Sequence, residues 1–326
     1  MARAKPGKVV HKLKGFQCRP IDQALEPVLL QKLLSKEKVS LMEVRINTHG
    51  KDKLATKVFF SDEKQGFEVS SVIIMGKKDC ALIDTQWSLA NGHRVAAEIL
   101  ETGLDLKTIY ITHAHPDHYF GLQPIVEAYP NARVIALPEV AKVINKQFID
   151  KMEHWEEQIG KFNYPTKPIP IEPMTENYFE LEGERIEIIP KIMGDLKYNT
   201  VVWIPSIKTL IGSDVLFNQA HPFTCEVTAE ERQQWIEDIE KLEKLGAEVV
   251  IPGHAKPGMP FDNSSFEFTK EYIKATEEEL ARTKTVGEFY YNMCQRFPDA
   301  NLFISNEMNS NVFKGQREWD WREDEE

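Results

Sequence analysis

The feature that most constrains this chain is the stretch at residues 112–121, which reads Thr-His-Ala-His-Pro-Asp-His-Tyr-Phe-Gly. It holds three histidines within six positions, in a chain that has only nine among its 326 residues. The preceding residues 107–112 are rich in β-branched and aromatic side chains, which is typical of a buried strand. Residues 120–129 carry apolar side chains at helical spacing and precede Pro130. The histidines are therefore predicted to lie on a turn between a strand and a helix.

The side chains of this turn are of the types that bind a divalent metal. His113 and His115 are two positions apart, so an extended backbone directs both toward the same side. Asp117 and His118 follow as the chain turns and can reach a second point nearby. Neutral imidazoles together with a carboxylate are ligands that zinc prefers. The alternative is a surface loop that is rich in histidine by chance, and the density of histidines here disfavours it.

The composition limits the partners. The formal net charge is −11, which argues against nucleic acid because binding phosphates requires clustered basic side chains. No apolar run approaches the length of a membrane span, and the basic N-terminal stretch lacks the apolar region of a secretory signal. The four cysteines show no Cys-x-x-Cys spacing, so we expect reduced thiols in a cytoplasmic protein. We expect a small-molecule substrate and no nucleic-acid or membrane partner, and a homodimer is left open.

The chain divides into three parts. Residues 1–38 are interpreted as an N-terminal extension, residues 39–262 as one αβ domain, and residues 263–326 as C-terminal helices and a tail. Within this last part, residues 269–283 are predicted to form a polar helix with a solvent-exposed face. In the middle of the chain, apolar side chains at helical spacing predict an amphipathic helix: Phe148, Met152, Trp155, Ile159 and Phe162. Whether that helix packs on the core or forms a wall of the substrate pocket is left open.

The same order of elements occurs twice in the αβ domain. A strand ends in Asp84, a helix follows at about residues 92–101, and the next strand leads to His113. In the second half, a strand ends in Asp214, a helix begins after the capping residue Thr228, and a strand ends in His254. Two similar αβ halves that face each other would bring both sets of strand ends to one place.

The pattern His-x-His-x-Asp-His after a strand resembles the signature of the metallo-β-lactamase-fold superfamily. The resemblance extends over about residues 40–262 and implies an α/β fold, a four-layer αβ/βα sandwich. It also implies two metal ions held side by side, with Asp214 as the bridging aspartate and His254 as the late histidine ligand. Asp84 matches an aspartate that supports the ligands from behind. The ligands that the resemblance implies within the motif are His113, His115, Asp117 and His118.

The chain departs from the family at the ligand expected in its middle. The family has Gly-His there, whereas this chain has Gly194-Asp195 and no histidine from residue 155 to residue 220. If Asp195 binds metal, the first site is more anionic and its preference shifts toward iron or manganese. If Asp195 only forms a turn, one ion would be held by Asp117, His118 and His254 with Asp214 or Asn218. The expected cofactor is therefore Zn²⁺, one or two ions per chain, with Fe and Mn as options.

The resemblance implies a metal-dependent hydrolase that uses a metal-bound hydroxide on a small or medium electrophile such as a lactone, ester, thioester or amide. Asp117 is the expected catalytic residue, because it can orient the hydroxide and pass a proton to the leaving group. Three further residues are candidates for the pocket: Tyr119, Asn218 and His221. A loop-packing role is the favoured alternative for His221.

Other activities within the superfamily stay open. The sequence around Asp117, Asn218 and His254 also resembles chlorothalonil dehalogenase, a member that displaces chloride from an aromatic ring by hydrolysis. Members that contain iron oxidise persulfides, and an aspartate at position 195 would suit iron. RNA-processing members are disfavoured by the net charge. A binding protein without turnover is disfavoured because Asp117 is retained.

Overall fold

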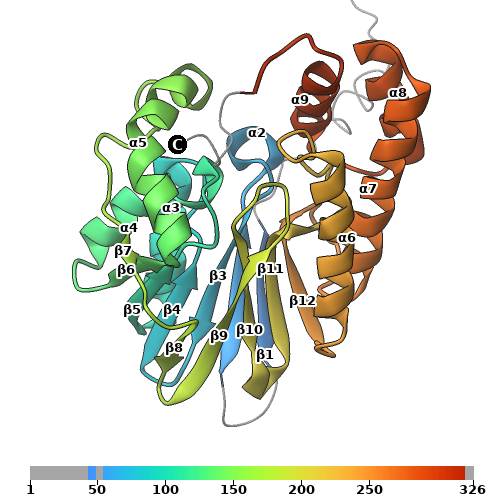
Figure 1. Ribbon diagram of the computed structural model, residues 1–326. Coiled ribbons are helices and arrows are strands. Elements are labelled where there is room, and N and C mark those ends of the chain that lie inside the picture. The colour runs from blue at the N-terminus through green and yellow to red at the C-terminus, as the bar shows by residue number, and fades with distance from the viewer. Residues whose placement is uncertain (1–42, 49–53, 320–326) are drawn as a thin grey trace, which may run out of the picture. The chain divides into compact units, whose positions relative to one another are not determined.

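The computed structural model describes residues 43–48 and 54–319 of the chain. These residues form two β-sheets that pack face to face, with helices covering the outer face of each sheet (Figure 1). The predicted four-layer αβ/βα sandwich is thus confirmed. The N-terminal extension predicted at residues 1–38 lies outside the described residues.

The first sheet has seven strands in sequence order. The strands are β1 (Glu43–Thr48), β2 (Ala55–Phe60), β3 (Ser70–Met75), β4 (Asp79–Ile83), β5 (Asp105–Tyr110), β6 (Arg133–Ala136) and β7 (Glu172–Pro173). Neighbours are antiparallel from β1 to β4 and parallel from β4 to β7. Its helices are α2 (Glu63–Gly66), α3 (Leu89–Thr102), α4 (Leu122–Ala128) and α5 (Pro138–Ile159), and a 3₁₀ turn, η1 (Pro116–His118), precedes α4.

The second sheet has five strands in the order β12-β11-β10-β9-β8. The strands are β8 (Tyr178–Leu181), β9 (Glu184–Ile192), β10 (Asn199–Ile204), β11 (Thr209–Asn218) and β12 (Val249–Ala255). Only β11 and β12 are parallel, and the other described pairs are antiparallel. Its helices are α6 (Ala229–Glu243), α7 (Ser264–Arg282), α8 (Val286–Arg296) and α9 (Phe303–Phe313), and η2 (Pro205–Ile207) joins β10 to β11.

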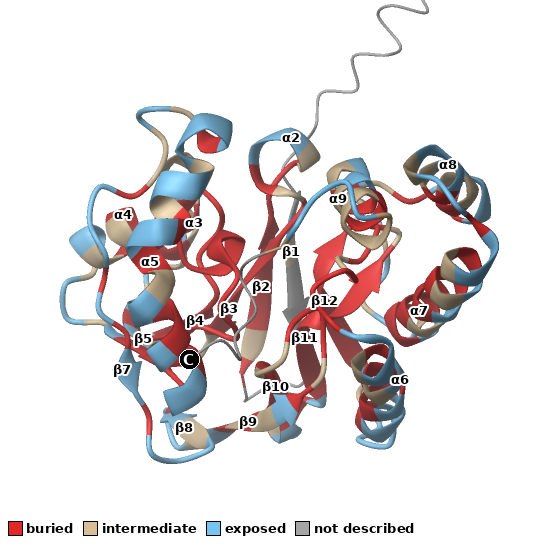
Figure 2. Cartoon of the chain, turned by 45° about the horizontal axis from the view of Figure 1, so that its top comes forward, coloured by how far each residue is buried: buried red, intermediate tan, exposed pale blue. Residues whose placement is uncertain are grey.

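The hydrophobic core has three layers, because each central strand is buried on both faces (Figure 2). On β3, Ile73 packs toward the helices of the first half, while Val72 and Ile74 pack between the two sheets. Successive side chains of a strand point to opposite faces, so a run of apolar residues such as this one fills two layers at once. The helices show buried inner faces and exposed outer faces in the same view.

The predicted repeat of strand, helix and strand is present in both halves. It is formed by β4, α3 and β5 in the first half and by β11, α6 and β12 in the second. Both strand pairs are parallel and adjacent, and Thr228 caps α6 with the predicted capping box. The predicted end of the second-half strand at Asp214 was wrong. Strand β11 continues to Asn218 through an irregular register after Ser213.

Two helices differ from the sequence-based expectation. The amphipathic helix α5 starts ten residues earlier than the pattern suggested, at Pro138. Phe162, which was counted in its apolar stripe, lies beyond the helix and is 90% exposed. The prediction of a solvated helix at residues 269–283 was incomplete, because α7 buries an apolar face that includes Phe266, Tyr272 and Ile273.

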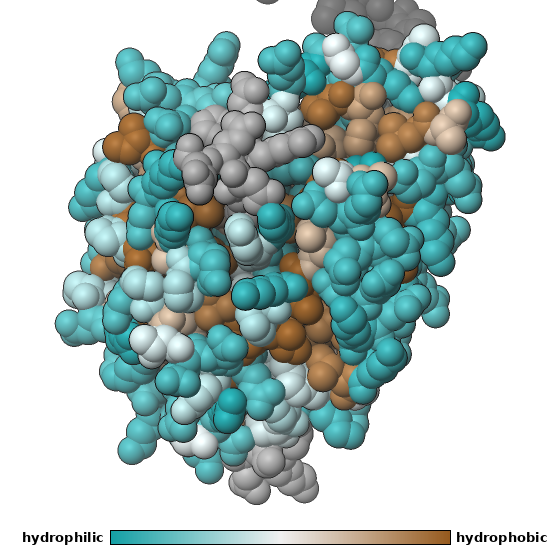
Figure 3. Space-filling model, in the orientation of Figure 1, coloured by the Kyte–Doolittle hydropathy of each residue, from teal (hydrophilic) through white to brown (hydrophobic). Residues whose placement is uncertain are grey.

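The visible surface is mainly hydrophilic (Figure 3). Apolar side chains gather in the middle of this face, between the helices of the two halves, and at the upper right over α8 and α9. Among the described helices, none combines the length and apolar character needed to cross a bilayer. Three cysteines of the described part, Cys80, Cys225 and Cys294, are free thiols, as expected, and Cys18 lies outside it.

Candidate metal centre

The His-x-His-x-Asp-His stretch lies where the first sheet ends. It follows β5 and is buried throughout, and Pro116 begins the 3₁₀ turn η1 that contains Asp117 and His118. The turn closes by backbone hydrogen bonds from His118 N to His115 O at 3.1 Å and from Phe120 N to Pro116 O at 2.8 Å. This local fold separates the first two histidines from the last one, so the stretch serves two neighbouring clusters.

The first cluster consists of His113, His115, Asp195 and Asp214, whose potential ligand atoms all lie within 4.8 Å of one another. His115 Nδ1 lies 2.8 Å from Asp195 Oδ2, and His113 Nε2 lies 3.6 Å from Asp214 Oδ2. Asp195 comes from the loop between β9 and β10, where its other oxygen accepts a hydrogen bond from Asn199. The aspartate that replaces the expected histidine therefore lies within this cluster.

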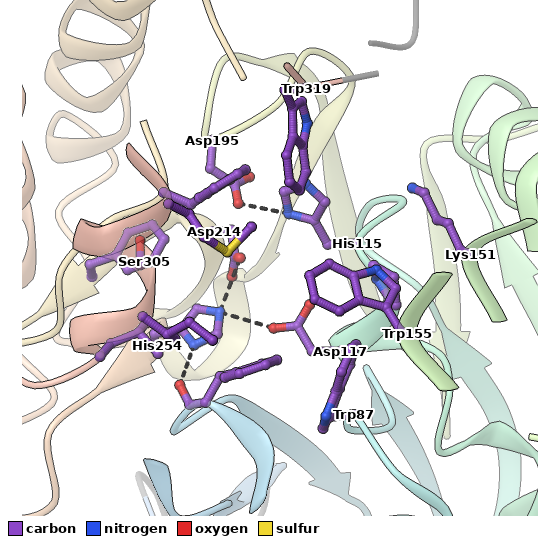
Figure 4. A pocket seen from close by; sticks show the side chains of 17 residues that line it. Trp87, His115, Asp117, Lys151, Trp155, Asp195, Asp214, His254, Ser305 and Trp319 are labelled. Carbon is purple, nitrogen blue, oxygen red and sulfur yellow. Dashed lines mark hydrogen bonds and ion pairs between the residues drawn. The ribbon is translucent and has the colours of Figure 1, made fainter. Parts of the chain in front are cut away.

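The second cluster consists of Asp117, His118, Asp214 and His254, again with ligand atoms within 4.8 Å of one another. His118 Nε2 lies 3.1 Å from Asp214 Oδ1, and His254 Nε2 lies 3.1 Å from Asp214 Oδ2. His254 Nε2 is also 3.4 Å from Asp117 Oδ2 (Figure 4). Asp214 is shared by both clusters, with one oxygen facing His118 and the other facing His113 and His254.

Several buried atoms of the clusters make no hydrogen bond within the described part of the chain. They are His113 Nε2, His118 Nε2, Asp195 Oδ2 and Asp214 Oδ1. His118 Nε2 lies 3.1 Å from Asp214 Oδ1, and Asp195 Oδ2 lies 2.8 Å from His115 Nδ1, yet neither pair has the geometry of a hydrogen bond. Buried polar atoms are nearly always satisfied, so a shared partner is required. A divalent cation in each cluster would satisfy them, and the donor set of imidazole and carboxylate fits zinc or iron.

The Nδ1 atoms of His118 and His254 make hydrogen bonds that orient the imidazole rings. Asp84 Oδ2 lies 2.8 Å from His118 Nδ1 and 2.7 Å from Thr112 Oγ1. His254 Nδ1 lies 2.7 Å from the carbonyl oxygen of Phe67. Since these contacts occupy Nδ1, the Nε2 atoms of both rings are left to face the second cluster.

Glu226 contacts His115 of the first cluster on the ring nitrogen that faces away from Asp195. Its Oε2 lies 3.1 Å from His115 Nε2 and accepts a hydrogen bond of 2.7 Å from Trp319 Nε1. The glutamate therefore connects a metal-ligand candidate to a tryptophan close to the end of the described chain. Sequence reasoning missed Glu226, because no motif or spacing around it distinguishes it from other glutamates.

The backbone around Asp214 is shaped for close approach. A Cβ at Gly253 would lie 2.1 Å from Asp214 Oδ1, so only glycine lets the two strands bring His254 beside this carboxylate. Ser213 has a φ of 45° and Asp84 a φ of 57°, both in the left-handed region that non-glycine residues seldom adopt. Such strain tends to occur at functional sites, where the surroundings enforce it.

Opposite charges within the second cluster shift the pKa values of its members. Burial acts to raise the pKa of Asp117, but the charge of His118 and a hydrogen bond from His254 outweigh it and hold the pKa at about 2. Burial acts to lower the pKa of His254, but the carboxylates of Asp214 and Asp117 raise it to about 10. A cation that binds here must therefore displace a proton from His254, so metal uptake is coupled to proton release.

A pocket opens over the two clusters (Figure 4). Its floor contains residues of both clusters: His115, Asp117, Asp195, Asp214 and His254. Its walls come from distant parts of the chain: Phe67, Trp87, Lys151, Trp155, Phe217, Phe223, Leu302, Ile304, Ser305, Met308 and Trp319. The amphipathic helix α5 both packs on the core and forms a wall of the pocket. Phe148 is buried in the core, while Lys151 and Trp155 line the pocket.

The three further candidates do not line this pocket. Tyr119 is fully buried against Phe120 and Phe148 in the core of the first half. His221 turns toward Tyr272, whose hydroxyl lies 3.0 Å from its Nδ1. Asn218 donates a hydrogen bond to Ser264 of α7. Tyr119 and Asn218 thus contact α5 and α7 instead of lining the pocket. His221 takes the loop-packing role that was its favoured interpretation.

Comparison with known proteins agrees with this architecture. A model described as "Metallo-beta-lactamase superfamily" matches residues 65–254. Among solved structures, DIM-1 metallo-beta-lactamase is 22% identical with a TM-score of 0.52, over 71% of this chain and 97% of that chain. A metallo-beta-lactamase from Pontibacter korlensis is 19% identical with a TM-score of 0.52, over 71% and 99%. The metallo-beta-lactamase IND-7 is 20% identical with a TM-score of 0.54, over 72% of this chain and 99% of that chain. No curated protein matches the chain significantly.

Proposed function

Because the chain belongs to the metallo-β-lactamase superfamily, we propose that it is a metal-dependent hydrolase. Its substrate would be a small or medium electrophile such as a lactone, ester, thioester or amide. The observation that carries the proposal is the pair of buried clusters that share Asp214 at the floor of a pocket. Zinc is the proposed ion, because histidine and carboxylate are its common ligands.

The first cluster would be held by His113, His115 and Asp195, the second by Asp117, His118 and His254, with Asp214 common to both. Divalent ions at these positions would lower the pKa of water to about 7 and polarise the electrophilic carbonyl. Three carboxylates against two divalent ions leave one net positive charge. This balance would favour the negative charge that develops in the transition state of acyl transfer.

Asp117 has the role of proton carrier in this proposal. Its side chain lines the pocket and lies 3.4 Å from His254. In the metal-free chain burial raises its pKa, but the charges of His118 and His254 outweigh burial and hold the pKa at about 2. Cation binding would displace the protons that lower this pKa, and the carboxylate could then accept a proton from water and deliver it to the leaving group.

Two alternatives rest on specific features. The carboxylate of Asp195 in the first cluster is a harder ligand than histidine and would suit iron, so oxidation of a persulfide is the second candidate function. The aromatic residues of the pocket, including Trp87 and Trp155, would also suit hydrolytic displacement of a halide from an aromatic ring.

The experiment that tests the proposal is a screen of the full chain loaded with zinc or with iron. Proton release from an ester, thioester or lactone with the zinc form, and its loss in the Asp117→Asn variant, would support hydrolysis. Oxygen consumption with a persulfide by the iron form alone would instead support the oxidative alternative. Chloride release from a chlorinated aromatic would support dehalogenation.

A further inference from the structure

One wall of the pocket is a set of aromatic side chains whose rings contact one another in tilted and edge-to-face arrangements. This tryptophan wall consists of Phe67, Trp87 and Trp155, with ring centroids 4.9 Å apart for Phe67 and Trp87 and 5.3 Å apart for Trp87 and Trp155. Trp87 is 5% exposed and stacks on Phe120 at 5.7 Å, so the wall is anchored in the core. Trp155 and Trp87 lie beside Asp117 (Figure 4), which places the wall next to the proposed reacting centre.

The opposite wall is contributed mainly by the C-terminal part of the described chain. This C-terminal wall consists of Phe223, Leu302, Ile304, Met308 and Trp319. The ring of Phe223 lies 5.8 Å from that of His115 and 5.0 Å from that of Trp319. The hydrogen bond from Trp319 to Glu226 fixes the indole relative to the first cluster. Both walls therefore reach the metal-ligand candidates.

The charges of the pocket disfavour an ionised group on the substrate away from the reacting bond. Lys151 is the one lysine or arginine among the residues that line the pocket. It is 4% exposed, and its ammonium donates a hydrogen bond of 2.7 Å to the carbonyl oxygen of Ala114. An ionised substituent between apolar walls would lose hydration without a matching partner, which is costly.

We propose, on the basis of the hydrolase function above, that the substrate carries an uncharged aromatic ring close to its scissile bond. The ring would lie between the tryptophan wall and the C-terminal wall. Aromatic pairs with centroids about 4.5–7 Å apart gain affinity beyond that from the burial of apolar area. This gain distinguishes an aromatic ring from a saturated ring of the same size, which only buries area.

The test compares three thioesters that share one leaving group, N-acetylcysteamine. Their acyl groups are 3-phenylpropanoyl, 3-cyclohexylpropanoyl and succinyl, so the scissile bond is the same and the distal group differs. With the metal-loaded full chain we expect kcat/KM to be about tenfold higher for the phenyl than for the cyclohexyl compound, as aromatic contacts on both sides would give. We expect the succinyl compound to be the poorest substrate.

The outcomes separate this inference from the proposed function. Equal hydrolysis of the phenyl and cyclohexyl compounds, or a preference for the succinyl compound, would overturn the aromatic inference and leave the hydrolase intact. If none of the three is hydrolysed, calorimetric binding of the unreactive ketones 4-phenylbutan-2-one and 4-cyclohexylbutan-2-one decides. Tighter binding of the phenyl ketone, about fivefold or more, supports the aromatic site, and equal Kd values overturn it.

Variants assign the preference to the walls. Trp155→Ala and Trp319→Ala are each expected to reduce the phenyl-to-cyclohexyl ratio several-fold, while Trp155→Phe keeps most of it because a ring remains. Tyr291→Ala, which removes an aromatic side chain that is 61% exposed on α8, is the matched control and should leave the ratio unchanged. A ratio that is the same in Trp155→Ala, Trp319→Ala and wild type would contradict the proposed binding mode.

Discussion

The two αβ halves contribute to the candidate metal centre in different ways. The first half supplies His113, His115, Asp117 and His118 from one short stretch after β5. The second half supplies Asp195, Asp214 and His254 from three separate segments. In the first half a single loop conformation sets the ligand positions, whereas in the second they depend on how β10, β11 and β12 are aligned.

This difference has a consequence for mutagenesis. The backbone of the loop after β5 is closed by its own hydrogen bonds, so replacement of a ligand side chain there should alter chemistry more than folding. Positions around Asp214 depend on close contact between two strands, so changes there should affect folding and metal binding together.

Asp117→Asn should reduce kcat by about 10³-fold, because the amide can neither accept the proton nor bind the metal as a carboxylate does. The variant should still fold, because Asp117 lies in the turn η1 and belongs to none of the three apolar core clusters. Steady-state kinetics and urea unfolding measure turnover and folding, and His118→Ala should likewise lose activity while it stays folded. Normal turnover in both variants would refute the site assignment.

Gly253→Ala should destabilise the protein by about 3 kcal/mol and reduce its metal content. The new Cβ would lie 2.1 Å from Asp214 Oδ1 and close to Ser213, and a contact of this kind forces the strands apart. The control is Gly287→Ala on α8, where a Cβ meets nothing within 4 Å. Urea unfolding and metal analysis should find the control unchanged or slightly more stable, and equal effects in both variants would contradict the close-approach argument.

His221 and His254, two histidines of the second half, should have pKa values shifted in opposite directions from the ordinary value. The carboxylates near His254 raise its pKa against the effect of burial, whereas burial without a nearby carboxylate lowers the pKa of His221 to about 4. The unfolded chain therefore binds a proton at position 221 first, near its ordinary pKa of about 6.5. The stability from neutral His221 is complete above that pH and is lost as the pH falls toward 4, by up to about 3 kcal/mol.

The measurement for His221 is the free energy of unfolding from pH 7.5 to pH 4.5, in wild type and in His221→Gln. The difference between the two curves isolates this residue from Glu68, whose pKa burial raises to about 7 and which favours the folded state at low pH instead. Parallel curves would show that His221 is not the buried neutral residue described here.

Glu226→Gln should weaken metal binding at the first cluster about tenfold and leave the second cluster unchanged, because loss of a partner behind a histidine ligand typically costs 10- to 100-fold in affinity. Glu230→Gln, an exposed change in the first turn of α6, is the control. Competition with a fluorescent chelator measures the two affinities. Equal affinities in all three proteins would mean that Glu226 does not position His115.

Much of the fold could be predicted from the sequence, because strands buried on both faces and capped helices leave strong local patterns. The capping box at Thr228 and the strand that leads to His113 are examples. The bulge at Ser213 was not predictable, since it arises from pairing between β11 and β12. The length of α5 was underestimated because its first turns lack the aromatic residues that mark its later part.

The residues of the site were likewise predictable where a local motif marks them and unpredictable where only tertiary contacts place them. Ligand candidates in the contiguous motif were identified from spacing alone, and Asp214, His254 and Asp195 from the family resemblance; the structure brings all of them together. Glu226 and Trp319 were missed as parts of the site, because their contact with His115 exists only in the tertiary structure. Asn218, expected near the pocket, instead donates a hydrogen bond to Ser264 of α7. The loop-packing role favoured for His221 agrees with its buried contact with Tyr272.

We propose that two ions share Asp214, and the metal content of the purified full chain tests this proposal directly. Elemental analysis by mass spectrometry is expected to find two divalent ions per wild-type chain, about one after Asp195→Asn, and none retained after Asp214→Asn. One ion per wild-type chain, or two ions retained without the carboxylate of Asp214, would contradict it.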